Sequence, residues 1–274
     1  MFIFFLIIMG LTVLLYPVIS TKWNDYRNRQ LTSVYEKSVQ EGGDTLLMKM
    51  KMEADAYNQT LYVPSVPDAF SMRDGVRDET YENLLNPEGN GIMANLDIPS
   101  IHVSLPVYHY TTDETMNKGA GHLFGSSLPV GGKGTHAVIS AHRGLPSARM
   151  FTDLNLVKKG DCFYIHVLGE TLAYEVDQIL TVDPDQTESL AIDRNQDYVT
   201  LLTCTPYAIN TQRLLVRGHR VPYKKGEAEK EKSTVRMDHT RLFFQILSGA
   251  AGILAAAIII KIVKWLEKRK KGST

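Results

Sequence analysis

The middle of the chain consists of short apolar runs separated by turn-forming residues, and this pattern constrains the fold more than any other feature. Val, Ile, Thr and aromatic residues fill the runs, while Gly, Pro and Asp bound them. Runs of this kind are typical of β-strands, and many of them without long intervening helices predict a barrel or a sandwich. The expected strands are 91–98, 103–108, 135–140, 161–167, 171–176, 198–203 and 213–218. We therefore expect one mainly β domain over residues 91–223.

An apolar run occupies residues 2–19 at the amino-terminal end. Its length is close to the minimum with which a helix crosses a bilayer. A signal peptide is the alternative, but no charged residues precede the run and no small-x-small cleavage site follows it. We expect an uncleaved membrane segment over residues 1–20.

A second apolar run, residues 242–260, is followed at once by a cluster of Lys and Arg. Positive charge beside a membrane span marks its cytoplasmic side. A peripheral amphipathic helix is the alternative, but this run is apolar on all sides rather than on one face. The pattern predicts a transmembrane helix at 241–263, a basic cytoplasmic tail at 264–274, and a main domain outside the membrane.

Three further segments connect these parts. Residues 21–62 have aromatic and apolar residues at helical spacing, with a glycine-containing break at 41–44, so we expect two helices. Residues 63–90 contain several prolines and glycines and are expected to form mostly loop; a loop of this length is often functional. Residues 224–240 are charged and poor in apolar side chains, which is typical of a tether.

Composition excludes some classes of protein. The chain has 274 residues, with 30 Lys+Arg balanced by 30 Asp+Glu, whereas a nucleic-acid-binding protein normally carries a basic excess. Its two cysteines are too few for a small scaffold held by disulfides. Cys162 lies at the start of a predicted strand and is expected to be a small buried apolar residue, although a bridge to Cys204 remains open.

Cys204 ends a predicted strand beside a loop, where a cysteine is well placed for chemistry. Arg213 begins the next strand, so antiparallel pairing would set the two residues opposite each other. A guanidinium near a thiol favours the thiolate, and it offers donors to a developing oxyanion. Spacing alone is also compatible with chance.

A thiol nucleophile needs an acid–base partner to protonate its leaving group. His142 also stands at a strand end, before a turn, and His122 is a second candidate. A structural role is the alternative for either histidine. A zinc site is less favoured, because no Cys-x-x-Cys or His-x-x-x-His pair occurs.

At these residues a family resemblance appears. TLLTCTPY (200–207), NTQRLLVRG (210–218), AHRGLPS (141–147) and GAGHL (119–123) resemble the motifs of sortases, and specifically of class C, the pilin polymerases. The resemblance covers roughly residues 91–223. It implies a closed sortase β-barrel of about eight strands, no cofactor and no metal, and a catalytic triad of His142, Cys204 and Arg213.

The resemblance also implies a reaction. The thiol of Cys204 would attack the Thr–Gly carbonyl of an LPxTG-like sorting signal and form a thioacyl enzyme. His142 would protonate the departing amine, and Arg213 would hold substrate and oxyanion. A lysine amine of the next pilin subunit would then take the acyl group, at the outer face of a Gram-positive cell membrane. Thr203, Thr205 and His122 are further candidates for binding the substrate.

Class C members usually carry a lid with an Asp-Pro-aromatic motif. Asp68-Ala69-Phe70 lies in the expected loop, so Asp68 is expected to pair with Arg213 and Phe70 to cover Cys204. An ordinary surface loop is the alternative. The chain departs from the class at three positions: Ala69 replaces the usual proline, Phe124 a common Glu, and Ala208 a common Gly.

Other functions remain to be weighed against pilin polymerisation. A sortase that anchors proteins to the cell-wall peptide usually lacks a second span and a lid. A catalytically silent assembly scaffold would not need Cys204, His142 and Arg213 together. A hydrolytic cysteine protease is the remaining alternative, since water can also resolve a thioester.

Overall fold

The computed structural model describes residues 2–61, 68–70 and 77–224, together with residues 252 and 261. The expected helix at 241–263, the tail at 264–274 and the tether beyond residue 224 otherwise lie outside the described residues. Among the residues that the structure does describe, no helix is both long enough and apolar enough to span a bilayer.

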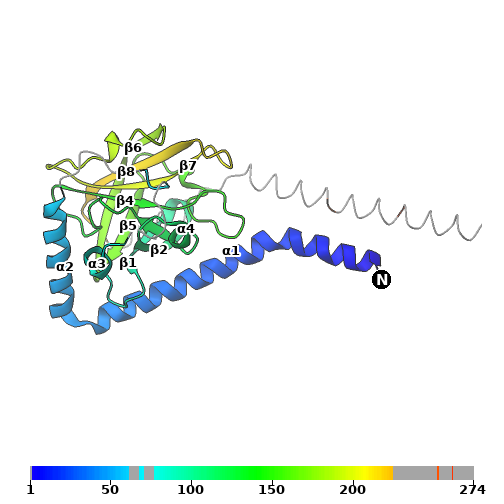
Figure 1. The fold of residues 1–274 in the computed structure, drawn as a ribbon, viewed down its shortest axis with the longest axis horizontal. Helices are drawn as coiled ribbons and strands as arrows, with labels where there is room; N and C mark the ends of the chain where they lie inside the picture. The colour runs from blue at the N-terminus through cyan, green and yellow to red at the C-terminus, as the bar shows by residue number, and fades with distance from the viewer. Residues whose placement is uncertain (1, 62–67, 71–76, 225–251, 253–260, 262–274) are drawn as a thin grey trace, which may run out of the picture.

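Eight strands form a closed barrel (Figure 1). The strands are β1 Ile92–Ile98, β2 Val103–His109, β3 Ala120–His122, β4 Thr135–Ser140, β5 Cys162–Val167, β6 Glu170–Val182, β7 Asp197–Thr205 and β8 Gln212–Val221. Their order around the barrel is β1-β2-β3-β4-β7-β8-β6-β5. The expected closed β-barrel of about eight strands is therefore confirmed.

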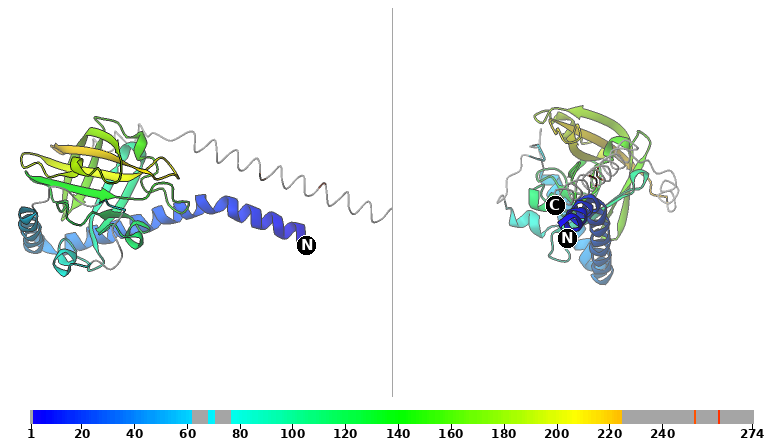
Figure 2. Two further views of the ribbon diagram at one scale, coloured as in Figure 1. Left: turned by 45° about the horizontal axis from the view of Figure 1, so that its top comes forward. Right: turned by 90° about the vertical axis from the view of Figure 1, so that its right-hand side faces the viewer.

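The helices are short within the barrel domain and long before it. They are α1 Phe2–Glu41, α2 Gly43–Thr60, α3 Glu79–Asn83 and α4 Asp113–Met116, with 3-10 turns at Pro99–Ile101, Leu154–Leu156 and Glu188–Leu190. Figures 1 and 2 show α1 as one long helix that passes under the barrel, and α2 turning up along its side. Because α1 is continuous, the chain has no break at residue 20.

Strand β3 did not appear in the sequence analysis. It has only three residues, too few for an alternating pattern to be visible. It pairs parallel with β2 and antiparallel with β4. Its place in the sheet is therefore fixed by its neighbours rather than by its own composition.

Helix α3 is a short helix within residues 63–90, the segment that was expected to form mostly loop. Asp78 caps this helix by accepting a hydrogen bond from the Tyr81 backbone N–H (2.9 Å). Tyr81 is fully buried among other aromatic side chains, including Phe124. Five residues cannot show a helical period, so only tertiary packing reveals this helix.

Both long helices are attached to the barrel through specific polar contacts. On α1, the Tyr35 hydroxyl donates to the Met93 carbonyl (2.9 Å). On α2, the Asn58 amide both donates to and accepts from the backbone of Leu128, at 3.1 and 2.7 Å. These contacts supplement apolar burial and fix the direction of each helix against the sheet.

Candidate active site

The parallel pairing of β4 with β7 brings the two chain segments of the site to one end of the barrel. Ser140 lies opposite Leu202 in this register. His142 follows Ser140 by two residues, and Cys204 follows Leu202 by two residues. Both side chains therefore emerge where the two strands stop pairing.

On its other side β7 pairs antiparallel with β8, and here Cys204 lies directly opposite Arg213. The expected pairing is thus confirmed. The connecting loop places Ala208 and Asn210 in the left-handed region, with φ of 64° and 60°. Arg213 also donates to the Asn210 carbonyl (3.2 Å), so the loop closes over the start of β8.

Alternation along β7 separates the catalytic face from the barrel interior. Leu201 belongs to the main core of the barrel, whereas Leu202 belongs to a second apolar cluster. Cys204 lies on the same face of the strand as Leu202. The thiol is therefore directed toward the second cluster and not into the main core.

Residues 68–70 lie over this face, and we call them the lid segment. The carboxylate of Asp68 accepts two hydrogen bonds from Arg213, at 2.7 Å from Nε and 2.8 Å from the terminal nitrogen Nη2. The Phe70 ring lies 5.8 Å from the His142 ring, centroid to centroid, and 5.1 Å from the Arg213 guanidinium carbon. The lid segment therefore contacts two members of the predicted triad.

Ala69 anchors the lid segment, a role that the sequence analysis missed. Its side chain is 0 % exposed. It packs in the second apolar cluster, whose other buried members are Leu123, Val138, Leu190, Leu202 and Leu215. The signal available in the sequence was a small apolar residue between a charge and an aromatic ring, which alone is too common to interpret.

Burial governs the protonation states of the site. Burial raises the pKa of the Cys204 thiol; the charge of Arg213 opposes this rise and that of Asp68 adds to it. Burial also lowers the pKa of His142, against a smaller opposite effect of Asp113. Since Cys204 is only 8 % exposed, the resting site holds a neutral thiol beside a neutral imidazole.

The two threonines beside Cys204 stabilise the site from behind. The Thr203 hydroxyl is fully buried and donates to the Ala141 carbonyl (2.7 Å). The Thr205 hydroxyl accepts a hydrogen bond from Arg143 (2.8 Å). Both hydroxyls therefore have hydrogen-bond partners within the protein, and these partners, Ala141 and Arg143, are the residues on either side of His142.

The prediction that His122 binds substrate needs correction. Its side chain is 0 % exposed. Nδ1 lies 2.7 Å from the Tyr81 hydroxyl, and Nε2 lies 2.8 Å from the Ser127 carbonyl. Burial lowers the pKa of this imidazole to about 4, so His122 is a neutral structural residue inside the domain.

Cys162 is half-buried, rather than fully buried as expected, and neither Cys162 nor Cys204 is in a disulfide. Cys204 is therefore available as a nucleophile. In the part of the chain that the structure describes, no three His, Cys, Asp or Glu side chains gather as a metal site.

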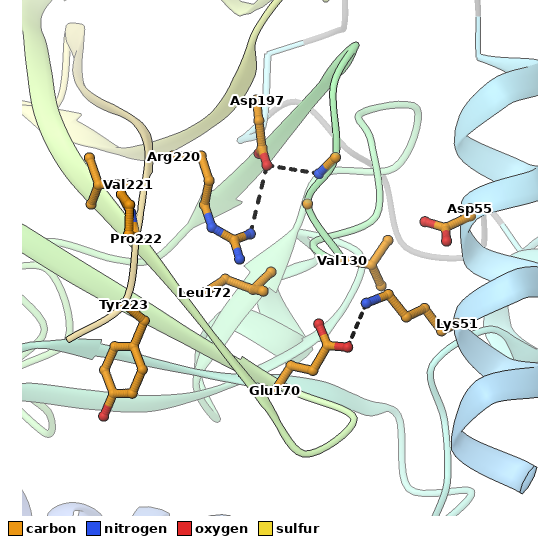
Figure 3. A pocket seen from close by; sticks show the side chains of 12 residues that line it. Lys51, Asp55, Val130, Glu170, Leu172, Asp197, Arg220, Val221, Pro222 and Tyr223 are labelled. Atoms are coloured by element: carbon orange, nitrogen blue, oxygen red, sulfur yellow. Dashed lines mark hydrogen bonds and ion pairs between the residues drawn. The ribbon is translucent and has the colours of Figure 1, made fainter. Parts of the chain in front are cut away.

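A hollow of about 520 Å³ lies at the end of the barrel opposite to Cys204. Its wall includes Asp197, which begins β7, and Arg220, near the end of β8. Figure 3 shows Lys51 of α2 paired with Glu170 and Arg220 paired with Asp197 across this hollow. No predicted site residue lines it; the Lys51–Glu170 pair joins α2 to β6, and the Arg220–Asp197 pair joins β8 to β7.

Comparison with known proteins now identifies the family. The sortase domain model matches residues 96–221, which span β1 to β8. Sortase C-1 from Actinomyces oris is 47% identical; the match covers 65% of this chain and 99% of that one, with a TM-score of 0.62. The chain belongs to the sortase family.

A second structure, sortase C from Streptococcus pneumoniae, is 43% identical to this sortase. The match covers 72% of this chain and 98% of that one, with a TM-score of 0.68. Its published description concerns catalysis and pilin substrate specificity. With two sortase C structures at this level of identity, the chain groups with the class C sortases.

Curated relatives match a smaller part of this sortase. Sortase A of Bacillus anthracis is 30% identical over 133 residues, which are 48% of this chain and 61% of the relative. The chain thus aligns with less than two thirds of that relative's length.

Two departures of this sortase from its class have structural explanations. Phe124 packs against the Tyr81 ring, at 4.9 Å between centroids and 67° between planes, so it extends the aromatic contact that holds α3. Ala208 adopts a left-handed conformation (φ 64°), in which glycine has no steric cost. Neither residue belongs to the triad.

Proposed function

We propose that this sortase is a pilin polymerase that uses Cys204 as nucleophile, His142 as acid–base and Arg213 as the group that holds substrate and oxyanion. The observation that carries the proposal is the register of β7 on β8, with Cys204 opposite Arg213, while β4 delivers His142 to the same barrel end. The relatives named above support the chemistry, and the sortase C neighbours favour pilin subunits as substrates.

The reaction proceeds in two balanced steps. The Cys204 thiol gives its proton to His142 as the sulfur attacks the threonine carbonyl of an LPxTG-like signal, the threonine–glycine C–N bond breaks, and His142 delivers that proton to the departing amine. A lysine amine of another pilin subunit then attacks the thioester and gives up a proton to His142. An isopeptide bond forms, the carbon–sulfur bond breaks, and His142 passes the proton to the departing Cys204 sulfur.

Arg213 supplies charge where charge develops. Its guanidinium is held opposite the thiol by β-sheet register, so little reorganisation is needed as the carbonyl oxygen becomes negative. In the closed state Asp68 occupies two of its donors. Substrate must therefore displace the lid segment before Arg213 can bind an oxyanion.

The lid is part of the proposal. Three contacts support it: the Asp68 carboxylate on Arg213, the Phe70 ring beside His142, and the Ala69 side chain in the second apolar cluster. An ordinary surface loop would not bury its middle residue completely. The lid segment holds the enzyme in a resting state in which the nucleophile is a neutral, shielded thiol.

The proposal also places the protein at the cell membrane of a Gram-positive bacterium, with the barrel domain outside. Its support is the apolar run at 242–260 with the basic cluster after it, and the apolar run at 2–19. The two spans would tether the barrel near the membrane, where newly secreted pilins emerge. Reporter fusions to each terminus test this orientation.

Cell-wall anchoring is the second candidate, because it uses the same acyl-enzyme and differs only in the amine that resolves it. The full-length protein should be incubated with a purified pilin that carries a sorting signal, and the products followed on a denaturing gel. Polymerisation predicts a ladder of covalent multimers that disappears with Cys204→Ala and persists with Cys162→Ala, the matched control.

Replacing the acceptor lysine of the pilin by arginine separates the two functions. Polymerisation predicts that the ladder is lost while the sorting signal is still cleaved. Cleavage that depends on an added small peptide amine, with no ladder from the native pilin, would instead favour anchoring. A Cys204→Ala protein that still forms the ladder would contradict the mechanism itself.

A further inference from the structure

The backbone ladder between β4 and β7 ends just short of the catalytic residues. Its last backbone link runs from the Ala141 N–H to the Leu202 carbonyl (3.2 Å), and just beyond it the Thr203 hydroxyl donates to the Ala141 carbonyl (2.7 Å). His142 and Cys204 each lie one residue further on. Their separation therefore depends on what joins the two segments beyond this point.

The next link outward is made by side chains. Arg143, which follows His142, donates to the Thr205 hydroxyl (2.8 Å), and Thr205 follows Cys204. Since successive residues of a strand point to opposite faces, Thr205 lies on the face away from the thiol. Arg143 thus reaches the end of Cys204's strand through Thr205.

The guanidinium of Arg143 is held at three points. Besides Thr205, its Nε donates to the Thr152 carbonyl (3.2 Å) and its second terminal nitrogen to the Asn155 side chain (2.9 Å). Thr152 and Asn155 belong to one loop, whereas Thr205 lies at the end of β7. A planar group with fixed donors transmits position better than a flexible ammonium can.

Phe151 and Thr152 also form hydrogen bonds that close the loop carrying His142. The backbone N–H of Phe151 donates to the His142 carbonyl (3.0 Å), and the N–H of Gly144 donates to the Thr152 hydroxyl (3.2 Å). These two hydrogen bonds tie the ends of the segment 142–152 to each other. Arg143 connects that segment to the end of β7.

We propose that Arg143 is a positioning residue for the acylation reaction, which fixes the His142 imidazole relative to the Cys204 thiol through its hydrogen bond to Thr205. This inference rests on the proposed function, since it assigns no chemistry to Arg143 itself. The alternative is that Arg143 only stabilises the loop at 142–155. If Arg143 only stabilises the loop, loss of its bond to Asn155 and loss of its bond to Thr205 should slow acylation to the same extent. If Arg143 positions His142, only loss of the bond to Thr205 should slow acylation.

The test compares Arg143→Gln, Thr205→Val and the matched control Asn155→Ala in the full-length protein, with single-turnover acylation by a sorting-signal peptide as the readout. Displacement of a reacting group by about 1 Å costs roughly 100-fold in rate. We expect a loss of that order for Arg143→Gln and for Thr205→Val, and little change for Asn155→Ala. A positioning role predicts that KM changes little, because it alters the rate of the acylation step rather than the binding of the peptide.

Coupling and rescue distinguish positioning from general stability. The double variant Arg143→Gln/Thr205→Val should be no slower than either single variant, because both remove the same link. Thr205→Ser should retain the wild-type rate, since its hydroxyl still accepts the hydrogen bond. Independent losses that multiply in the double variant, or a wild-type rate in Thr205→Val, would overturn the proposal.

The pH profile supplies a readout that a structural role would not move. Loosening the His142 loop exposes the imidazole, so the acid limb of the profile should shift toward the ordinary histidine pKa of about 6.5 in Arg143→Gln and Thr205→Val alike. It should stay in place in Asn155→Ala. Equal shifts in all three variants would overturn the proposal.

The proposed function can fail separately. A wild-type enzyme that does not form an acyl-enzyme with any sorting-signal peptide would contradict the proposed function. The alkylation rate of Cys204 as a function of pH then decides the positioning role. If Arg143→Gln and Thr205→Val change the pH profile of alkylation in the same way, the positioning role is supported. If both variants keep the wild-type profile, the positioning role is rejected.

Discussion

The carboxylate of Asp68 and the guanidinium of Arg213, 145 residues apart in the chain, form a forked pair with both hydrogen bonds at 2.7–2.8 Å. Only 11 % of the Arg213 side chain and 12 % of the Asp68 side chain are exposed. Paired, shielded geometry of this kind is stronger than a surface ion pair. Because Arg213 lies opposite Cys204, the pair controls the charge that the thiol experiences.

We predict that Asp68→Asn increases the reactivity of Cys204. In the closed state the Asp68 charge helps to raise the pKa of the thiol, while Arg213 acts to lower it. Removing the negative charge lowers that pKa, so a larger fraction is thiolate at any given pH. The measurement is the rate of alkylation by a small reagent against pH, and the profile should move to lower pH.

Asp177→Asn is the matched control for this substitution. Asp177 makes an equally forked pair with Arg217, at 3.0 and 2.9 Å, elsewhere on the barrel. Its removal should leave the Cys204 profile unchanged. An unchanged profile in Asp68→Asn would refute electrostatic control by the lid segment without touching the triad.

Phe70→Ala is expected to open the lid more often. The ring contacts His142 and Arg213, and its loss removes apolar burial together with a cation–π contact. A weakening of roughly 1.4 kcal/mol would raise the open population, and hence the labelling rate of Cys204, about tenfold. Phe124→Ala, which loses contacts with Tyr81 instead, should not increase labelling.

Ala208→Gly is expected to stabilise the protein. Ala208 has φ 64°, a left-handed conformation that costs a non-glycine residue roughly 1 kcal/mol. Glycine also makes the unfolded chain more flexible, which offsets part of this stabilisation. The free energy of unfolding should therefore rise by about 0.5 kcal/mol. Urea denaturation measures it.

Ala191→Gly is the matched control and should have the opposite sign. Ala191 has an ordinary φ of −61°, so glycine only adds flexibility to the unfolded chain and costs about 0.5–1 kcal/mol. Equal effects of the two substitutions would show that the Ala208 backbone is not strained.

Two buried histidines should make the fold sensitive to acid. Burial lowers the pKa of both His122 and His136 to about 4, against about 6.5 in an unfolded chain. The unfolded state therefore binds more protons between these values, and stability is lost as pH falls from about 6.5 toward 4. Each histidine should cost about 2 kcal/mol by pH 5.

Urea midpoints at pH 7 and pH 5 check this expectation. His122→Gln should be less stable than the wild type at pH 7, because its bonds to Tyr81 and Ser127 are lost or altered. It should nevertheless show a smaller drop between the two pH values. An undiminished drop would mean that His122 does not titrate as described.

The fold class and the predicted triad follow from the sequence for local reasons. Alternating apolar runs report strands directly, because side-chain direction has a period of two residues. Cys204 and Arg213 are separated by one short loop, so an antiparallel hairpin brings them opposite each other without knowledge of the rest of the chain. The motifs around His142 and Cys204 then point to the sortase family.

The rest depended on contacts between distant segments. The sequence did not show that β3 completes the barrel, that α3 interrupts the loop, or that His122 is sealed inside, since each depends on its neighbours. The burial of Ala69 and the bond from Arg143 to Thr205 join residues far apart in the chain. Local propensity determines strands and hairpins, whereas burial and the protonation states it imposes exist only once the barrel has closed.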